Sequence, residues 1–578
     1  MRTSYWLARC RSHDIVIVGA LSIAGWKYTS GIRGALDIAL WDESIYLTRG
    51  IGFLHFALPP PGDAPLYSIW YSLLARVSSD SIALYYLNCR MVTILPPVLF
   101  YILLRRYRVS LLTSSLSALF LLLTSANFYV WPKVNHFELM VLLAFLILAA
   151  IPKSWTLGFA ILAFGCLLTA YIRPEMFFAF VLCFAISVGS FLFRERTLFH
   201  VAPLASLALI AIVLMIVGNP LSGNRSLTAF GQHFSLNWHA WTHDASLSPW
   251  DDWRQIVQMN FGQVSGIGQA MLNNPAAFAR HVATNAIHLP GALVSTFALN
   301  PNFFAAFHMR PIEAYILLAL GFGGLLFLRR RAILSRLRLA MPTEKRFLLF
   351  VCAVCPVIIL SCLIIYPRPH YILVLGTLLL AVLVVLADPL KGRQVRWSHA
   401  VITALCAALV IVGITPRLVN FPPVVLPTVV NLLATPSRSQ PTLEAIEFIR
   451  TLGITAETHL LSKDWGYTSY LGENWGNPCD LVGCGNWKAV RIEQKLAGDP
   501  NDPSKYVPFD TFRRNEKINM ILVTDDLLND TRFRGDAEFK AFLENPERVN
   551  FVKLVLPDGK RDLYVDKTIL PVGRIGVS

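Results

Sequence analysis

Long apolar runs separated by short polar segments dominate the first 416 residues of the chain. Each run approaches the roughly 20 residues that a helix needs to cross the hydrocarbon core of a bilayer. About eleven such runs occur, at residues 15–32, 82–104, 110–130, 137–151, 155–172, 175–193, 198–217, 311–328, 347–366, 370–388 and 398–416. The run at 137–151 is the shortest, and its roughly 15 residues barely cross a bilayer. The pattern predicts a polytopic, all-α membrane protein with about eleven transmembrane helices.

The tail after residue 416 has a different pattern. It opens with the proline-rich segment PRLVNFPPVVLPTVV, which is typical of a stiff linker. The segments TLEAIEFIRTLG and DAEFKAFLENP have helical periodicity, and HLLS, NMILVTD, FVKLVLP and DLYVD have the character of short strands. We therefore expect a transmembrane domain at 1–416, a linker at 417–440 and a small α/β domain at 441–578.

Composition and charge support this division and add an orientation. Hydrophobic residues make up 55% of the chain and charged residues 15%, whereas soluble domains carry about a quarter charged residues. The net charge of +15 comes from clusters between apolar runs, which is typical of cytoplasmic loops beside anionic lipid and not of nucleic-acid binding. With a cytoplasmic N-terminus, the clusters near Arg105, Arg194, Arg330 and Lys391 all fall inside. The segments 33–81 and 218–310 and the tail then lie outside the cytoplasm.

The N-terminus and the cysteines each allow two interpretations. Arg2, Arg9 and Arg11 precede the first apolar run as in a signal peptide, but no small-x-small cleavage site follows, so we expect an uncleaved first span. The ten cysteines show no zinc spacing. Cys479 and Cys484 in NPCDLVGCGN would form a small-loop disulfide outside the cytoplasm or remain free thiols.

The first outer segment contains two adjacent carboxylates, Asp42 and Glu43, in DIALWDESIYLTRG. The apolar neighbours Trp41, Ile45 and Tyr46 would hold this pair near the membrane interface. A carboxylate there can deprotonate an acceptor hydroxyl, a step worth roughly 10²–10⁴ in rate. The simpler interpretation is a solvated acidic loop. Asp37 is a third carboxylate nearby and is expected to cap the segment.

Cations recur at the span ends that this topology assigns to the same outer face. The candidates for substrate or phosphate binding are these basic side chains and the neighbouring carboxylate Glu175: Arg90, Lys133, His136, Arg173, Arg368 and His370. Each one alone is explained as an interface anchor. Because outward loops normally contain few cations, their recurrence indicates a phosphate or diphosphate site.

The 218–310 segment is rich in aromatic and histidine side chains. It contains Trp238, Trp241, Trp250 and Trp253, and among its histidines are His233, His239 and His243. They favour amphipathic helices with an aromatic belt over a sugar or acceptor platform. His239 and His243 could bind a metal if helical, but no carboxylate-rich ligand set accompanies them. No metal site or other cofactor is therefore expected; a divalent metal is compatible with the sequence but not indicated by it.

Several motifs recur together in one order along the chain. WDESIY in the first outer loop is followed by PPGDAPLYSIWYSL, an Arg90-led second span, RPE before a mid-chain span and PRPHYILVL before a late span. This order resembles the GT-C superfamily of integral-membrane glycosyltransferases, in particular its protein O-mannosyltransferase and aminoarabinose-transferase-like branch. The resemblance covers roughly residues 15–416 and leaves the tail as an appended domain outside the cytoplasm.

The resemblance implies a chemistry. Such enzymes take a hexosyl or pentosyl group from a polyprenyl-phosphate carrier and invert its anomeric carbon. Asp42 matches the catalytic base and Glu43 its partner, and Arg173, Arg368 and His370 are candidates for the carrier phosphate. The implied partners are the lipid-linked donor, a lipid, glycan or protein acceptor, and membrane lipids, without nucleic acid. The expected location is a plasma membrane, in particular a bacterial inner membrane.

Two other functions are alternatives to a glycosyltransferase. A transporter or flippase for a polyprenyl-linked saccharide should show repeat symmetry and ionisable residues in mid-span, and the sequence shows neither clearly. A membrane scaffold whose tail binds a partner would leave the acidic pair and the outer cations unexplained.

Overall fold

The computed structural model describes residues 12–29, 32–54, 63–129, 131–222, 225–244, 246–250, 252–296, 342–388, 440–464, 466–472, 487–490, 508–529 and 531–571. The chain divides into two compact units. The first unit is drawn from residues 1–31, 60–66 and 89–435, and the second from 32–59, 67–88 and 436–578. The segment that carries Asp42 therefore groups with the tail and not with the transmembrane domain that the sequence pattern predicts at 1–416. The boundaries at 416 and 440 stay a prediction.

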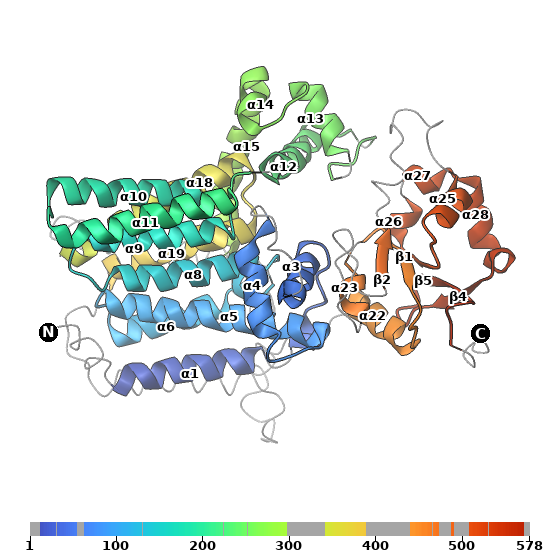
Figure 1. Cartoon of the computed structure of the whole chain (residues 1–578), viewed down its shortest axis with the longest axis horizontal. Coiled ribbons are helices and arrows are strands. Elements are labelled where there is room, and N and C mark those ends of the chain that lie inside the picture. Colours follow the sequence, from blue (N-terminus) through green and yellow to red (C-terminus); the bar gives the residue numbers. More distant parts are fainter. Residues whose placement is uncertain are drawn as a thin grey trace, which may run out of the picture. The chain divides into compact units, whose positions relative to one another are not determined.

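Helices make up the described part of the first unit (Figure 1). Their bounds are α1 Ser12–Tyr28, α5 Ser81–Arg106, α6 Leu111–Leu123, α7 Ser125–Tyr129, α8 Val134–Ala149, α9 Trp155–Ala170, α10 Met176–Phe193, α11 Leu198–Val217, α12 Arg225–Thr242, α13 Trp253–Phe261, α14 Ile267–Asn273, α15 Pro275–Thr296, α18 Pro342–Ile364 and α19 Pro369–Ala387. Residues of α5 before Cys89 belong to the second unit.

Every predicted apolar run that lies within the described residues forms a helix. The run at 110–130 divides into α6 and α7 because Thr124 takes an extended backbone conformation and its hydroxyl donates to the Leu121 carbonyl. The runs at 311–328 and 398–416 lie outside the described residues. Among the described helices, six are long and apolar enough to cross a membrane, and α6, α8 and α9 are shorter apolar helices. The described part is thus a mostly helical membrane protein, and the total of eleven spans stays a prediction.

The apolar helices pack closely on one another. Helix α9 contacts α8, α10 and α11, and α19 contacts α8 and α18 (Figure 1). Gly165 of α9 permits the approach of α8, because a Cβ atom there would lie 2.4 Å from the Cβ of Phe145. Small residues at such crossings are typical of membrane helices, whose association depends on close van der Waals packing.

The second unit combines loop helices with a small α/β domain. Its helices include α2 Ile32–Ala35, α3 Asp42–Ile51, most of α4 Pro65–Leu74, α22 Pro441–Thr451, α23 Thr468–Leu471, α25 Phe509–Asn515, α26 Asp525–Leu528, α27 Thr531–Arg534 and α28 Ala537–Glu544, with 3-10 turns at Gly52–Leu54 and Pro546–Val549. Its strands are β1 Thr458–Leu461, β2 Trp487–Val490, β3 Met520–Val523, β4 Phe551–Val555 and β5 Asp562–Asp566.

The five strands form one mixed sheet in the order β2-β1-β3-β5-β4. Strand β1 pairs in parallel with β2 and β3, and β5 pairs antiparallel with β3 and β4. The helices predicted from TLEAIEFIRTLG and DAEFKAFLENP and the four predicted strands are confirmed as α22, α28, β1, β3, β4 and β5. Strand β2 was missed, because its four residues WKAV contain one β-branched residue and no alternating pattern long enough to recognise.

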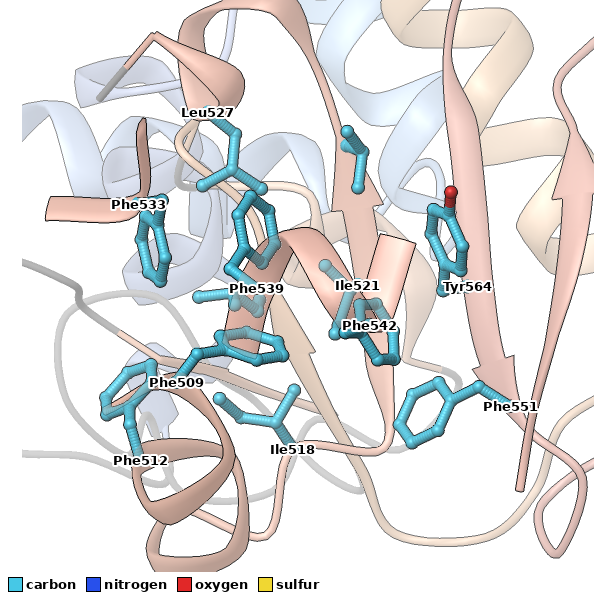
Figure 2. Close-up of a cluster of buried hydrophobic side chains, with 12 residues drawn as sticks. Phe509, Phe512, Ile518, Ile521, Leu527, Phe533, Phe539, Phe542, Phe551 and Tyr564 are labelled. Atoms are coloured by element: carbon cyan, nitrogen blue, oxygen red, sulfur yellow. The ribbon is translucent and has the colours of Figure 1, made fainter. Parts of the chain in front are cut away.

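The core of this domain is mainly aromatic (Figure 2). Leu461, Ile521 and Tyr564 lie side by side on β1, β3 and β5, so their side chains share one face of the sheet. Phenylalanines from the helices and from β4 pack with them: Phe509, Phe512, Phe533, Phe539, Phe542 and Phe551. Burying each ring contributes roughly 1.5–3 kcal/mol relative to leaving it exposed. The tail can therefore build a hydrophobic core of its own.

Asp37 has the capping role expected of it, but on a helix distant in sequence. Its two carboxylate oxygens accept hydrogen bonds from the backbone N–H groups of Thr442 and Leu443, both at 2.9 Å. These residues lie in the first turn of α22, where N–H groups lack partners within the helix. Asp37 thus links the segment that precedes α3 to the tail within the second unit.

Replacing Asp37 by Ala is expected to lower the free energy of unfolding by about 1–2 kcal/mol, the usual effect of losing a helix cap. Thermal unfolding of the purified full-length protein measures the change. Asp37→Asn keeps one acceptor oxygen and should fall between the wild type and Asp37→Ala. Equal stability of the wild type and Asp37→Ala would contradict this role.

Candidate functional site

Helix α3 places the acidic pair in its first turn. The Trp41 carbonyl accepts the first backbone hydrogen bonds of the helix, from Ser44 and Ile45. Asp42 and Glu43 follow directly, at the end where the helix dipole favours negative charge. Trp41 has φ 63° and ψ −129°, a conformation that costs energy for a residue with a Cβ atom. Such strain is concentrated at functional sites in proteins.

Glu43 is buried and fully engaged. Its Oε1 accepts hydrogen bonds from the hydroxyls of Tyr67 at 2.7 Å and Tyr71 at 2.5 Å, and from the Asn88 amide at 3.2 Å. Asn88 also contacts both tyrosine hydroxyls, at 2.6 and 2.8 Å. The side chain of Glu43 is 1% exposed, and the three donors are buried as well. Glu43 therefore fixes the start of α3 and does not face solvent.

The partners of Glu43 were not predicted from the sequence. The available signal was the spacing of Tyr67 and Tyr71 in LYSIWYSL, since residues four apart lie on the same face of a helix. The same spacing also suits an aromatic stretch at the membrane interface, which is what the sequence alone predicts. In the structure, both hydroxyls point to the same carboxylate oxygen.

Asp42 is exposed, in contrast to its neighbour. The same helix end is held by the turn at Gly466, whose φ is 117°. A Cβ atom at Gly466 would lie 2.6 Å from the Ser44 hydroxyl and 3.3 Å from the Trp41 nitrogen. Only glycine fits this combination of backbone conformation and close approach. The tail thus supports the start of α3 while Asp42 remains accessible.

In the first unit, Arg173 and Glu175 form an ion pair in the connection between α9 and α10. The Arg173 Nη2 lies 2.8 Å from Glu175 Oε1, and its Nε lies 3.0 Å from the same oxygen. Burial opposes the charge of Arg173, but the Glu175 carboxylate outweighs it and raises the pKa of the guanidinium. Burial likewise opposes ionisation of Glu175, while Arg173 keeps the pKa of this carboxyl below its ordinary value. Both groups are charged at neutral pH.

Arg368 and His370 belong to the same neighbourhood of the first unit through aromatic rings. The Arg173 guanidinium lies 4.4 Å from the centre of the Tyr371 ring. The His370 ring packs against that tyrosine with centroids 4.1 Å apart. Arg368 lies 4.7 Å from the Trp250 ring. The structure therefore brings Arg173 and His370 together around Tyr371. Arg368 precedes His370 by two residues in the chain.

The other predicted cations contact backbone carbonyls. Lys133 is fully buried, and its Nζ donates to Asn127 O and Phe128 O at 3.1 and 2.9 Å. The Nε2 of buried His136 lies 2.9 Å from Ala126 O. These contacts fix the start of α8 against the carbonyl groups of residues 126–128.

Arg90 contacts the end of α1, with Nη2 3.3 Å from Thr29 O and its guanidinium 4.3 Å from the Trp26 ring. Roles for Arg90, Lys133 and His136 in phosphate binding stay a prediction.

The 218–310 segment forms amphipathic helices within the described residues, as predicted. Phe230, Phe234 and Trp238 of α12 are buried against residues of α13 and α14. His239 and His243 do not share one helical face, because α12 ends at Thr242 and His243 has φ 54°. No group of three or more His, Cys, Asp or Glu side chains suited to a metal occurs among the described residues. Cys479 and Cys484 lie outside them.

Comparison with known proteins finds likeness among solved structures only. No protein-family model matches the chain, and no curated protein matches it. Among solved structures it is similar to the oligosaccharyltransferase of Archaeoglobus fulgidus, solved with zinc and sulfate. The two are 10% identical with a TM-score of 0.40, over 96% of this chain and 74% of that chain. A likeness at this TM-score carries no argument about fold or activity.

Proposed function

We propose that the protein is an inverting membrane glycosyltransferase of the GT-C type. It would transfer a sugar from a polyprenyl-phosphate carrier to a lipid, glycan or protein acceptor on the extracytoplasmic face. The observation that supports this most is that three neighbouring carboxylates have different environments, of which only one is open to a substrate. Asp37 caps α22 and Glu43 is buried among three donors, whereas Asp42 is exposed at the start of a supported helix.

In the proposed reaction Asp42 is the general base. It takes the proton of an acceptor hydroxyl as the acceptor oxygen attacks the anomeric carbon. The bond from that carbon to the phosphate oxygen breaks, and its electron pair leaves with the carrier phosphate. One displacement through an oxocarbenium-like transition state inverts the anomeric configuration. Glu43 is a positioning residue, because it holds the helix end and does not reach the reactants.

The leaving phosphate needs positive charge and no strong acid. Preorganised cations stabilise the charge that develops on such a group. Arg173 and Arg368 supply guanidinium groups suited to phosphate oxygens, and His370 lies beside them against Tyr371. The apolar helices provide an environment for a polyprenyl chain. The charge bias of the loops supports a tail outside the cytoplasm. A bacterial inner membrane as the location follows from the resemblance to GT-C enzymes alone.

A panel of labelled polyprenyl-phosphate sugars, offered to proteoliposomes with cell-envelope acceptors, tests this function. The proposal expects the label of at least one donor to reach a lipid, glycan or protein. Movement of the intact labelled lipid between leaflets without any transfer would overturn the proposal and favour a transporter.

Replacing Arg173 by Gln is expected to lower kcat/KM for the lipid-linked donor by roughly 10- to 100-fold, the usual effect of losing one charged hydrogen-bond partner. Because Glu175 is then left unpaired, the double variant Arg173→Gln/Glu175→Gln separates stability from phosphate binding. It should recover thermal stability without recovering kcat/KM. Exposed Arg254 provides the matched control. Equal activity of Arg173→Gln and Arg254→Gln would remove Arg173 from the site.

A further inference from the structure

His233 of α12 presents a buried nitrogen with no visible function. Its Nδ1 lies 2.6 Å from the Ala229 carbonyl oxygen. A carbonyl only accepts hydrogen bonds, so Nδ1 carries the proton and Nε2 of the neutral ring has a free lone pair. That Nε2 is buried and has no hydrogen-bond partner among the described residues. A buried acceptor without a partner costs free energy, so it calls for an explanation.

The ring stays neutral at physiological pH. Burial, and next the nearby positive charge of Arg368, lower the pKa of His233 to about 3. A neutral ring with an unprotonated Nε2 accepts a hydrogen bond and cannot donate one. A phosphate oxygen is itself an acceptor and does not suit this nitrogen. A hydroxyl group does.

Aromatic rings surround His233 within the first unit. Tyr366 stacks on it, with centroids 5.5 Å apart and planes at 26°. Trp250 and Tyr371 meet it edge-on at 5.9 and 6.2 Å. Trp250 is 43% exposed, so this group of rings reaches the surface of the described structure.

Two of these rings also contact the two guanidinium groups of the proposed phosphate site. Arg368 lies over Trp250, and Arg173 lies over Tyr371. A nitrogen that can accept a hydrogen bond from a hydroxyl, aromatic ring faces and cations thus occur together. The apolar faces of a pyranose or furanose ring pack on aromatic rings, its hydroxyls donate hydrogen bonds, and a phosphate linked to it takes the cations.

We propose that His233, Trp250, Tyr366 and Tyr371 form a saccharide subsite in which a sugar hydroxyl donates to His233 Nε2. This inference rests on the proposed function and adds the sugar side of the donor to its phosphate side. His233 is a specificity-determining residue in this subsite. The sequence pattern of 218–310 favours an aromatic belt over a sugar platform, whereas these four side chains support a sugar platform around His233.

Two variants separate the two nitrogens of His233. In His233→Asn the amide nitrogen can replace Nδ1 and keep the bond to Ala229, but nothing occupies the place of Nε2. In His233→Gln the longer side chain can place its amide oxygen near the position of Nε2. His243→Asn is the matched control, because His243 is exposed and its positive φ suits Asn.

Binding is measured with full-length protein in nanodiscs by tryptophan fluorescence. The probes are bare polyprenyl phosphate and the same lipid carrying each of a set of hexoses and pentoses. We expect the wild type to bind at least one glycosylated probe about tenfold more tightly than the bare lipid, as one neutral hydrogen bond to a buried acceptor provides. His233→Asn should lose this difference, and His233→Gln should recover most of it. Binding of the bare lipid should not change in any variant.

The outcomes distinguish this inference from the proposed function. If His233→Asn weakens bare and glycosylated lipid equally, or changes neither, the subsite is wrong while the glycosyltransferase stands. The same holds if the wild type transfers sugar but binds both lipids equally. If the wild type binds neither lipid, the proposed function and the subsite both fall.

Discussion

Asp42→Asn is expected to lower kcat for sugar transfer by roughly 10²–10⁴, the usual contribution of a general base. The amide keeps the size of the side chain but cannot take the acceptor proton. Because Asp42 is exposed at the start of α3, losing its charge should lower the free energy of unfolding by no more than about 1 kcal/mol, the usual effect of a charge at a helix N-terminus. The measurement is single-turnover transfer from a labelled polyprenyl-phosphate sugar, with the variant and the wild type at equal amounts of folded protein.

Asp525→Asn is the matched control for Asp42. Asp525 is also an exposed carboxylate at the first position of a helix in the second unit. It should transfer sugar at the wild-type rate. Near-normal transfer by Asp42→Asn would remove Asp42 as the base. A loss of rate in both variants would mean that helix-end charge matters in general and that Asp42 has no special role.

Glu43→Ala should produce the largest loss of stability among single changes at the site, roughly 2–4 kcal/mol in the free energy of unfolding. Removing the carboxylate leaves the hydroxyls of Tyr67 and Tyr71 and the Asn88 amide buried without their shared acceptor. It also opens a cavity in the place of a side chain that is 1% exposed. Thermal unfolding in detergent, monitored by circular dichroism, measures the loss.

Two further variants give this result its meaning. Glu43→Gln keeps one acceptor oxygen and should lose less stability than Glu43→Ala. Glu544→Ala truncates an exposed glutamate at the end of α28 and should change the free energy of unfolding by less than about 0.5 kcal/mol. If Glu43→Ala is as stable as Glu544→Ala, the buried network does not fix the start of α3.

The long apolar helices of the first unit followed from the sequence because their signal, an apolar run near membrane length, is local. Short apolar segments likewise predicted four strands of the tail. Asp42 could also be predicted as a candidate catalytic residue from its local sequence, because two adjacent carboxylates beside Trp41 are unusual in so apolar a chain.

The different roles of Asp42 and Glu43 could not be predicted, because they depend on distant partners. Glu43 is buried by Tyr67, Tyr71 and Asn88, which come from two other helices. Asp37 caps a helix 405 residues away in the chain. Nothing in the local sequence indicates which carboxylate such partners will engage.

The partners of the cations could not be predicted from the local sequence either. Lys133 and Arg173 both stand beside helix ends, and their local sequences do not separate them. In the structure Lys133 binds backbone carbonyls, whereas Arg173 pairs with Glu175 and lies over Tyr371. A cation at the end of a helix can bind unpaired carbonyls or a ligand, and only the fold decides which.

The anomeric configuration of the product tests the central claim most directly. A polyprenyl-phosphate sugar of known configuration is given to the wild-type protein with its acceptor, and the configuration of the transferred sugar is read from the NMR coupling constant at its anomeric carbon. A single displacement with Asp42 as the base predicts the opposite configuration to that of the donor. A product that retains the donor configuration would contradict the account.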